Sequence, residues 1–244
     1  MSLWAIAAGA VAGGFVNGLS GTGTALFALG FFLLALGPAE AVAVAALMSV
    51  VSGLQGLWVV RHAIAARPRR LARFVLPGLA GVPVGVALLS SIDAGTLRLG
   101  IGAVLVIYGG YFALRRALPR VERPMHAADA AVGLIGGVLG GAASLSGALP
   151  VIWLSLRPWP KAETRAVLQP FNVAVLGTTV AMLAWRGAYG TQTLAACALA
   201  LPVGVVAAQA GIAVFRRLSD DGFRRLLVSL TLLLGLGILL DELI

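Results

Sequence analysis

Long apolar runs, separated by short basic segments, make up most of the chain. A helix of about 20 apolar residues crosses the hydrocarbon core of a bilayer, so runs of this length are typical of transmembrane helices. We predict full spans at residues 41–60, 74–89, 97–114, 166–185, 194–215 and 226–240. The fold is therefore expected to be an all-α polytopic membrane protein.

Two further apolar regions, residues 3–36 and 127–156, are interrupted by short polar breaks. The breaks read Gly18-Leu19-Ser20-Gly21-Thr22-Gly23 and Ser144-Leu145-Ser146-Gly147. Each half of a region holds about 12–16 residues, or about 18–24 Å of helix, which is shorter than the roughly 30 Å hydrocarbon core. We therefore predict a re-entrant helical hairpin in each region, with its polar tip near the middle of the membrane.

The basic residues favour this topology. If each broken region returns to the side from which it entered, 16 of the 18 Lys and Arg residues fall on one face, and Arg98 and Arg186 fall on the other. Loops rich in Lys and Arg stay in the cytoplasm. We therefore expect a multi-pass protein of a bacterial-type inner membrane, with cytoplasmic Arg-rich loops and both termini outside the cytoplasm.

Composition agrees with a membrane protein, since hydrophobic residues make up 60% and charged residues only 11% of the chain. The net charge of +9 lies in clusters between apolar runs. Anionic lipid at the cytoplasmic face explains such clusters, so we expect the lipid bilayer as a partner and no nucleic acid. The single cysteine, Cys197, permits no internal disulfide. No His, Cys, Asp and Glu residues recur at metal-ligand spacing, so neither a metal nor a cofactor is expected.

The two halves of the chain match at an offset of 126 residues. The matched residues around the breaks are Gly14, Leu19, Ser20 and Gly21 with Gly140, Leu145, Ser146 and Gly147. We predict two repeats, residues 1–120 and 127–244, each with one hairpin and three spans. Three crossings are an odd number, so the second repeat is expected to be inverted. Inverted repeats with discontinuous helices are typical of secondary transporters, whose site lies between the repeats near the midplane.

The two breaks also carry a family resemblance. Residues 13–23 and 136–147, with Pro38 and Pro160 opening the following spans, resemble the TauE/SafE family of sulfite and organosulfonate exporters. The resemblance implies export of a small sulfur-containing oxyanion, such as sulfite, an organosulfonate or thiosulfate, and no enzymatic activity. The second break continues as Ala148-Leu149-Pro150 where the first has Thr22-Gly23-Thr24, so the two hairpins are expected to contribute unequally.

Physical chemistry also points to an anion at the breaks. The second helix of each hairpin starts at the tip, and unpaired N–H groups at a helix N-terminus bind oxyanions. Hydroxyls, amides and glycine backbone would complete the site, with one repeat rocking against the other around it. The candidate residues are Asn17, Ser20, Gly21, Thr22, Gly23, Thr24, Ser144, Ser146, Gly147, Gln169 and Asn172. Gly18, Gly21, Gly23 and Gly147 are also expected to permit positive φ.

Each of these polar residues has a structural alternative. A hydroxyl can cap its own helix or bond a local carbonyl, and Gln169 and Asn172 can join neighbouring helices. Ser49 and Ser52, in the corresponding stretch of the first repeat, fit interhelical bonding better. Arg165 is expected as an interfacial anchor, the alternative being that it draws an anion toward the cytoplasmic mouth.

Two other functions compete with a transporter. A passive anion channel can share polar re-entrant tips, and sequence does not reveal alternating access. An intramembrane serine protease would use the rhomboid-like Gly18-Leu19-Ser20-Gly21, but His62 and His126 both lie beside Arg-rich loops, and a serine nucleophile needs a nearby base. We expect no buried Asp, Glu or His as a proton relay, so protons as coupling ion rest on the resemblance alone. A homodimer is compatible with the sequence.

Overall fold

A computed structural model describes residues 2–88 and 120–243, together with the isolated positions 99, 103, 106 and 110. All regular structure in these residues is helical, which confirms the all-α prediction. The helices are α1 (Leu3–Ser20), α2 (Thr24–Leu33), α3 (Pro38–Ala66), α4 (Pro68–Leu88), α6 (His126–Ala143), α7 (Ala148–Ser155), α8 (Lys161–Trp185), α9 (Thr191–Arg217) and α10 (Asp220–Leu243).

By length and composition, six of these helices can cross a membrane: α1, α3, α4, α6, α8 and α9. They indicate a multi-pass membrane protein. The spans predicted at 41–60, 74–89, 166–185, 194–215 and 226–240 fall on α3, α4, α8, α9 and α10, whereas the one at 97–114 lies outside the described residues. Several helices extend beyond the predicted bounds because an apolar run marks the hydrocarbon core, and the backbone stays helical into the interface.

The start of α3 shows how such an extension is stabilised. Pro38 occupies the first helical position, where its missing N–H costs nothing, and the Glu40 carboxylate accepts the N–H of Gly37 at 3.1 Å. Pro160 stands in the corresponding place before α8, as its N-cap residue. Both prolines therefore open the helix that follows each broken region.

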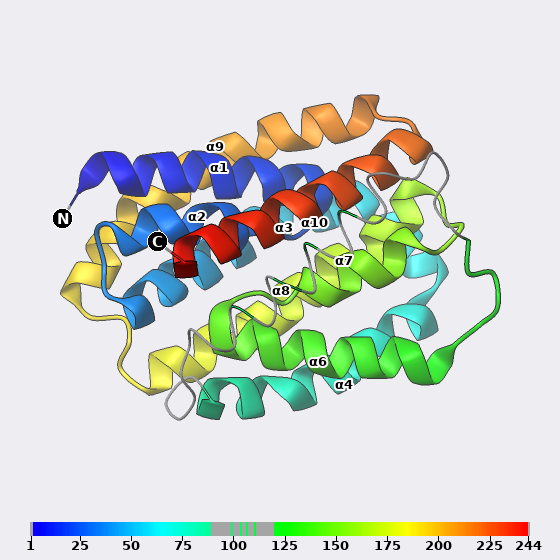
Figure 1. Cartoon of the computed structure of the whole chain (residues 1–244), viewed down its shortest axis with the longest axis horizontal. Coiled ribbons are helices and arrows are strands. Elements are labelled where there is room, and N and C mark those ends of the chain that lie inside the picture. Colours follow the sequence, from blue (N-terminus) through cyan, green and yellow to red (C-terminus); the bar gives the residue numbers. More distant parts are fainter. Residues whose placement is uncertain are drawn as a thin grey trace.

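Glycine allows the longest helix pairs to pack at backbone distance. Helix α1 lies along α9, and α4 lies along α6 (Figure 1). A Cβ added at Gly14 would lie 2.8 Å from the Cα of Gly204, and one at Gly141 would lie 2.9 Å from the backbone nitrogen of Val86. Real side chains do not approach so closely, so these interfaces require small residues. Helices α3 and α8 pack against each other and against both pairs.

The two breaks divide their regions less evenly than the sequence predicts. The arms have 18 and 10 residues in α1 and α2, and 18 and 8 residues in α6 and α7. The expectation of halves of about 12–16 residues is therefore wrong. Gly18 stays inside α1 because it packs against the backbone of Ala208, and the helix ends only at Gly21.

Backbone conformation at the breaks also differs from the prediction at two glycines. Gly21 and Gly23 have φ of 90° and 94°, in the left-handed region that glycine tolerates. Gly18 is helical, and Gly147 has φ of −83°, so positive φ is wrong at both. In the second break Ser144, the residue after α6, takes the left-handed conformation with φ of 57°.

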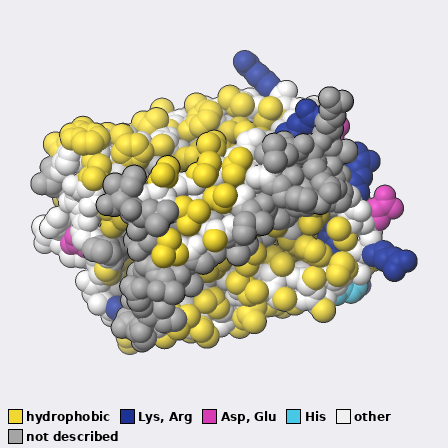
Figure 2. Space-filling model, in the orientation of Figure 1, with side chains coloured by type: hydrophobic (Ala, Val, Ile, Leu, Met, Phe, Trp, Pro, Cys, Tyr) yellow, Lys and Arg dark blue, Asp and Glu magenta, His cyan; other side chains and the backbone are white. Residues whose placement is uncertain are grey.

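The ends of the bundle differ in charge. Figure 1 shows both termini at one end of the bundle, and the α3–α4, α7–α8 and α9–α10 loops at the other. Helices α1 and α6 begin at opposite ends. On the face seen in Figure 2, Lys and Arg side chains gather mainly at the end with these loops, and hydrophobic side chains cover the middle. We call this the basic end.

Candidate functional site

The two breaks meet inside the bundle. A Cβ at Gly147 would overlap the hydroxyl of Thr22, so these two residues are in direct contact. The Asn172 Oδ1 of α8 accepts hydrogen bonds from Ser146 Oγ at 2.7 Å and from Thr22 Oγ1 at 3.4 Å. One amide of α8 therefore connects both breaks.

A serine of α3 extends this connection. The Ser49 hydroxyl accepts a bond from Asn172 Nδ2 at 3.0 Å and one from Thr24 Oγ1 at 2.9 Å. Asn17 donates to the Ser49 carbonyl at 2.9 Å, while its own Oδ1 has no partner in the described structure. All of these side chains are buried. We call Asn17, Thr22, Thr24, Ser49, Ser146 and Asn172 the junction network.

A small cavity lies beside the junction network. The two breaks line it with Ser20, Thr22, Gly23, Gly147 and Ala148, and an apolar wall is formed by Val16, Leu26, Phe27, Val151, Leu227 and Leu230. Gly23 and Gly147 are the N-cap residues of α2 and α7, so the positive ends of two helix dipoles lie beside one cavity. Such N-termini bind oxyanions through their free N–H groups.

The cavity volume is about 20 Å³, enough for about one water molecule. Sulfite or a sulfonate is larger, so the described conformation is closed around this point. The leucines of α10, Leu227 and Leu230, form part of the wall. A larger anion therefore requires the residues that line the cavity to move.

Other predicted site residues have local or separate partners. Ser20 Oγ lies 2.9 Å from the Val16 carbonyl oxygen and 2.7 Å from that of Thr22, as expected of a hydroxyl that bonds its own break, although it also lines the cavity. Ser144 Oγ donates to the Val42 carbonyl at 3.2 Å, away from the junction network. Gly21 contacts Gln169. The role of all these residues in binding stays a prediction.

Sequence reasoning misjudged Arg165. Its side chain is fully buried, so it is not an interfacial anchor. Its Nε and Nη2 atoms donate to Gln169 Oε1 at 3.3 and 3.1 Å, and the guanidinium lies 4.4 Å from the ring centroid of Phe215. Arg165 and Gln169 are four residues apart in the sequence and therefore share a helix face, and this spacing could have predicted that they interact.

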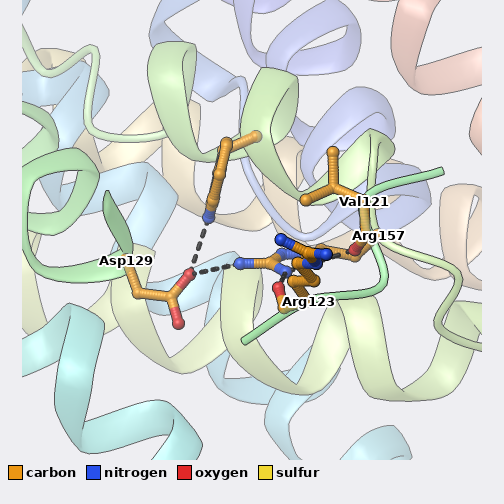
Figure 3. A network of polar contacts seen from close by, with 5 residues as sticks. Val121, Arg123, Asp129 and Arg157 are labelled. Atoms are coloured by element: carbon orange, nitrogen blue, oxygen red, sulfur yellow. Dashed lines mark hydrogen bonds and ion pairs between the residues drawn. The ribbon is translucent and has the colours of Figure 1, made fainter. Parts of the chain in front are cut away.

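A buried ion pair near the basic end was also missed. Asp129, at 3% exposure, lies 3.1 Å from the Nη2 of Arg157 and accepts the indole N–H of Trp153 at 2.7 Å. Figure 3 shows the Arg157 guanidinium between Asp129 and the carbonyls of Val121 and Arg123. Asp129 is thus a buried carboxylate that holds an ion pair, and the expectation that no buried Asp, Glu or His serves as a proton relay stays a prediction. An Asp in the first turn of an apolar helix was the available signal.

The geometry offers little to an enzyme. His62 and His126 are both exposed, whereas the Ser20 hydroxyl is buried and bonds backbone carbonyls. Among the described residues, no three His, Cys, Asp or Glu side chains group as a metal site would require.

Comparison with known proteins identifies the family. The family model described as "Sulfite exporter TauE/SafE" matches residues 5–238. A curated protein of Cupriavidus necator (strain ATCC 17699), named "Probable sulfite/organosulfonate exporter TauE", is 31% identical over 174 residues, which are 69% of this chain and 66% of that protein. No solved structure matches the chain. Because the family model covers nearly the whole chain, the protein belongs to the TauE/SafE family of sulfite exporters.

Proposed function

We propose that the protein is a secondary transporter that exports a small sulfur-containing oxyanion, namely sulfite, an organosulfonate or thiosulfate, across a bacterial-type inner membrane. The observation that carries the proposal is the convergence of the N-termini of α2 and α7 on one cavity lined by both breaks. Such a site binds a negative charge without a full cation. The family and the curated relative's printed name support the substrate class.

The cavity's apolar wall favours an organosulfonate within that class. A sulfonate head would lie against Thr22, Gly23 and Gly147, and its carbon substituent against side chains such as Leu26 and Val151. Binding sites commonly combine an apolar wall with a few polar groups that fix orientation. The junction network would hold the two breaks in register beneath the anion.

For the topology we propose two inverted repeats, residues 1–120 and 127–244, each with a re-entrant hairpin. Support comes from α1 and α6, which begin at opposite ends of the bundle, and from their breaks, which meet inside it (Figure 1). We assign the basic end to the cytoplasm because positively charged loops remain there. Both termini then lie outside the cytoplasm.

The proposed mechanism is alternating access around the cavity. The cavity is too small for the substrate in the described conformation, so the substrate-loaded state requires that its wall open. A carrier of this kind exchanges labelled for unlabelled substrate across the membrane, whereas a passive channel does not concentrate label against a gradient.

The test is uptake and counterflow of labelled sulfite, taurine and thiosulfate in proteoliposomes, with and without a pH gradient. We expect saturable counterflow of at least one anion, and a proton-coupled carrier would respond to the pH gradient. Ohmic flux without counterflow would replace the carrier by a channel. No flux of any of the three, from folded protein, would contradict the proposed substrate class.

A double variant tests the site itself. Ser20→Ala with Ser146→Ala removes one hydroxyl from each break, and we expect roughly tenfold or greater loss of anion affinity, as for hydrogen bonds to charged groups. Thr178→Ala is the control, because among the described residues its hydroxyl bonds the Ala174 carbonyl of its own helix, at 3.0 Å, and no other group. Unchanged affinity in the folded double variant would refute the site assignment.

A further inference from the structure

Arg165 is a buried cation that no carboxylate of the described residues pairs with. Among the described residues, Glu163 pairs with Arg67 and Arg70, and Asp129 pairs with Arg157. Within the described part of the chain, no carboxylate pairs with Arg165, although its side chain is fully buried. A buried guanidinium without an opposite charge is strongly unfavourable, so its retention needs a reason.

Two hydrogen-bond donors at this place are left over. A guanidinium has no acceptor, so the Gln169 amide must present its oxygen to Arg165, which leaves its NH₂ group for another acceptor. Gln169 Nε2 and Arg165 Nη1 are both buried and have no hydrogen-bond partner in the described structure. A guanidinium with one unsatisfied donor, next to an amide with another, is the chemistry that recognises an oxyanion.

Glycines of α3 and at the end of α1 pack directly against this pair. A Cβ at Gly56 would overlap Gln169 Oε1 and lie 2.8 Å from Arg165 Nη2, and one at Gly53 would lie 3.1 Å from Gln169 Nε2. Gly21, at the end of α1, also lies against both side chains. Side chains at these positions would displace the donors, so the glycines preserve the arrangement.

The C-terminus of α1 stabilises part of the positive charge of Arg165. Its dipole places about half a negative charge near Gly21, which favours a cation there. However, the Gly21 N–H already bonds the Asn17 carbonyl, and no carbonyl of α1 accepts from Arg165 Nη1. The helix end therefore offsets some of the charge and leaves the donors unsatisfied.

The pair also lies on a line toward the junction network. Arg165, Gln169 and Asn172 are spaced i, i+4 and i+7, on one face of α8, and all three are buried. Arg165 is in the second turn of α8, at the basic end, and Asn172 bonds both breaks about 10 Å farther along the helix. An anion moving from the basic end to the cavity would meet Arg165 first.

We propose that Arg165 and Gln169 form a second anion site, on the cytoplasmic side of the cavity, that selects a singly charged oxyanion such as a sulfonate. This inference rests on the proposed function. One buried guanidinium neutralises one negative charge, and a dianion would leave a second charge uncompensated in a low-dielectric interior. Arg216 adds positive potential, but its side chain is exposed and is screened by solvent.

The test uses the purified full chain with methanesulfonate and sulfate as probes at matched ionic strength. Ligand-induced shifts in Tm report binding, because a ligand that binds only the folded state stabilises it. We expect the wild type to bind methanesulfonate more tightly than sulfate. Equal affinity, or preference for sulfate, would overturn the selection of a single charge.

Arg165→Met removes the cation at similar volume. We expect roughly 10- to 100-fold weaker methanesulfonate binding, with a ligand-free Tm equal to or above that of the wild type, because an unpaired buried charge has been removed. Arg165→Lys should bind with intermediate affinity, since it keeps the charge and loses the fork of donors. The control is Arg217→Met, an exposed cation at the same end, which should bind as the wild type does.

The outcomes separate this site from the proposed function. Wild-type affinity in Arg165→Met, or a lowered ligand-free Tm with unchanged affinity, would show a structural role and overturn the second site alone. If Arg165→Met does not fold, Gln169→Leu takes its place, with weaker methanesulfonate binding expected and unchanged binding refuting the site. A wild type that neither binds nor transports any of the anions would overturn both proposals.

Discussion

The contact between Gly147 and Thr22 joins the two breaks, and replacing Gly147 with Ala tests it directly. Gly147 has φ of −83° and ψ of −10°, which alanine adopts without strain. The added methyl group would overlap the Thr22 hydroxyl and lie 2.6 Å from Thr22 Cγ2. Any effect of the substitution therefore comes from packing between the breaks and not from the local backbone.

The magnitude follows from the cost of overpacking. Forcing one methyl group into a filled interior typically costs about 1–3 kcal/mol. For a chain of this size each kcal/mol corresponds to a change of about 2–4 °C in Tm, so we expect Gly147→Ala to lower Tm by about 2–12 °C. Thr22→Ala in the same chain removes Oγ1 and Cγ2 and should recover part of the loss, because only Thr22 Cβ, 2.7 Å from the new methyl group, remains in the way.

Thermal unfolding of the purified protein in detergent, followed by intrinsic fluorescence, measures these changes. Gly177→Ala is the matched control: it lies in α8, and a Cβ there meets nothing within 4 Å. Alanine is a better helix former than glycine, so the control should be neutral or slightly stabilising. If Gly147→Ala behaves like this control, or if its effect and that of Thr22→Ala simply add, the breaks do not touch as described.

Two further predictions concern the basic end. Asp129→Asn should destabilise the protein by about 3–5 kcal/mol, because it leaves the buried Arg157 without its carboxylate. Glu163→Gln should cost no more than about 1 kcal/mol, because the ion pairs of Glu163 are partly exposed. Equal changes of Tm in the two variants would contradict the buried ion pair. In a cysteine-free background, Ser219→Cys should react with a membrane-impermeant maleimide only from the cytoplasmic side of the membrane. Gln192→Cys should react only from the opposite side. Labelling of both cysteines from the same side would refute the proposed topology.

The membrane helices could be predicted from sequence because their signal is local. Runs such as 41–60 and 194–215 are long and apolar, and each is followed directly by basic residues, so length and composition suffice. The ends of the helices were less predictable. Whether α1 stops at Gly18 or at Gly21 depends on Ala208 of α9, which packs against Gly18 and lies far away in the sequence.

The sequence was sufficient to predict which types of residue form the candidate site, but not which hydrogen bonds join them. The matched breaks predicted that both polar tips contribute to one site between the repeats, but the choice of Asn172 and Ser49 as the bridge between Ser146, Thr22 and Thr24 depends on how α8 and α3 pack. Arg165 was misjudged because a basic residue near the start of a span usually lies in the interface. Its burial follows from the glycines of α3 and from Phe215 of α9, which the sequence of α8 does not reveal.

The glycine-lined interfaces between α1 and α9 and between α4 and α6, which we call glycine seams, determine which parts of the protein can move as rigid bodies. Each seam joins a helix of the first sequence half to one of the second, at backbone-to-backbone distance. Sliding or opening a seam would lose close contacts along its whole length, so each helix pair should travel together. The mobile units would then be interchanged pairs, α1 with α9 and α4 with α6, and a hinge between residues 120 and 127 would not separate them.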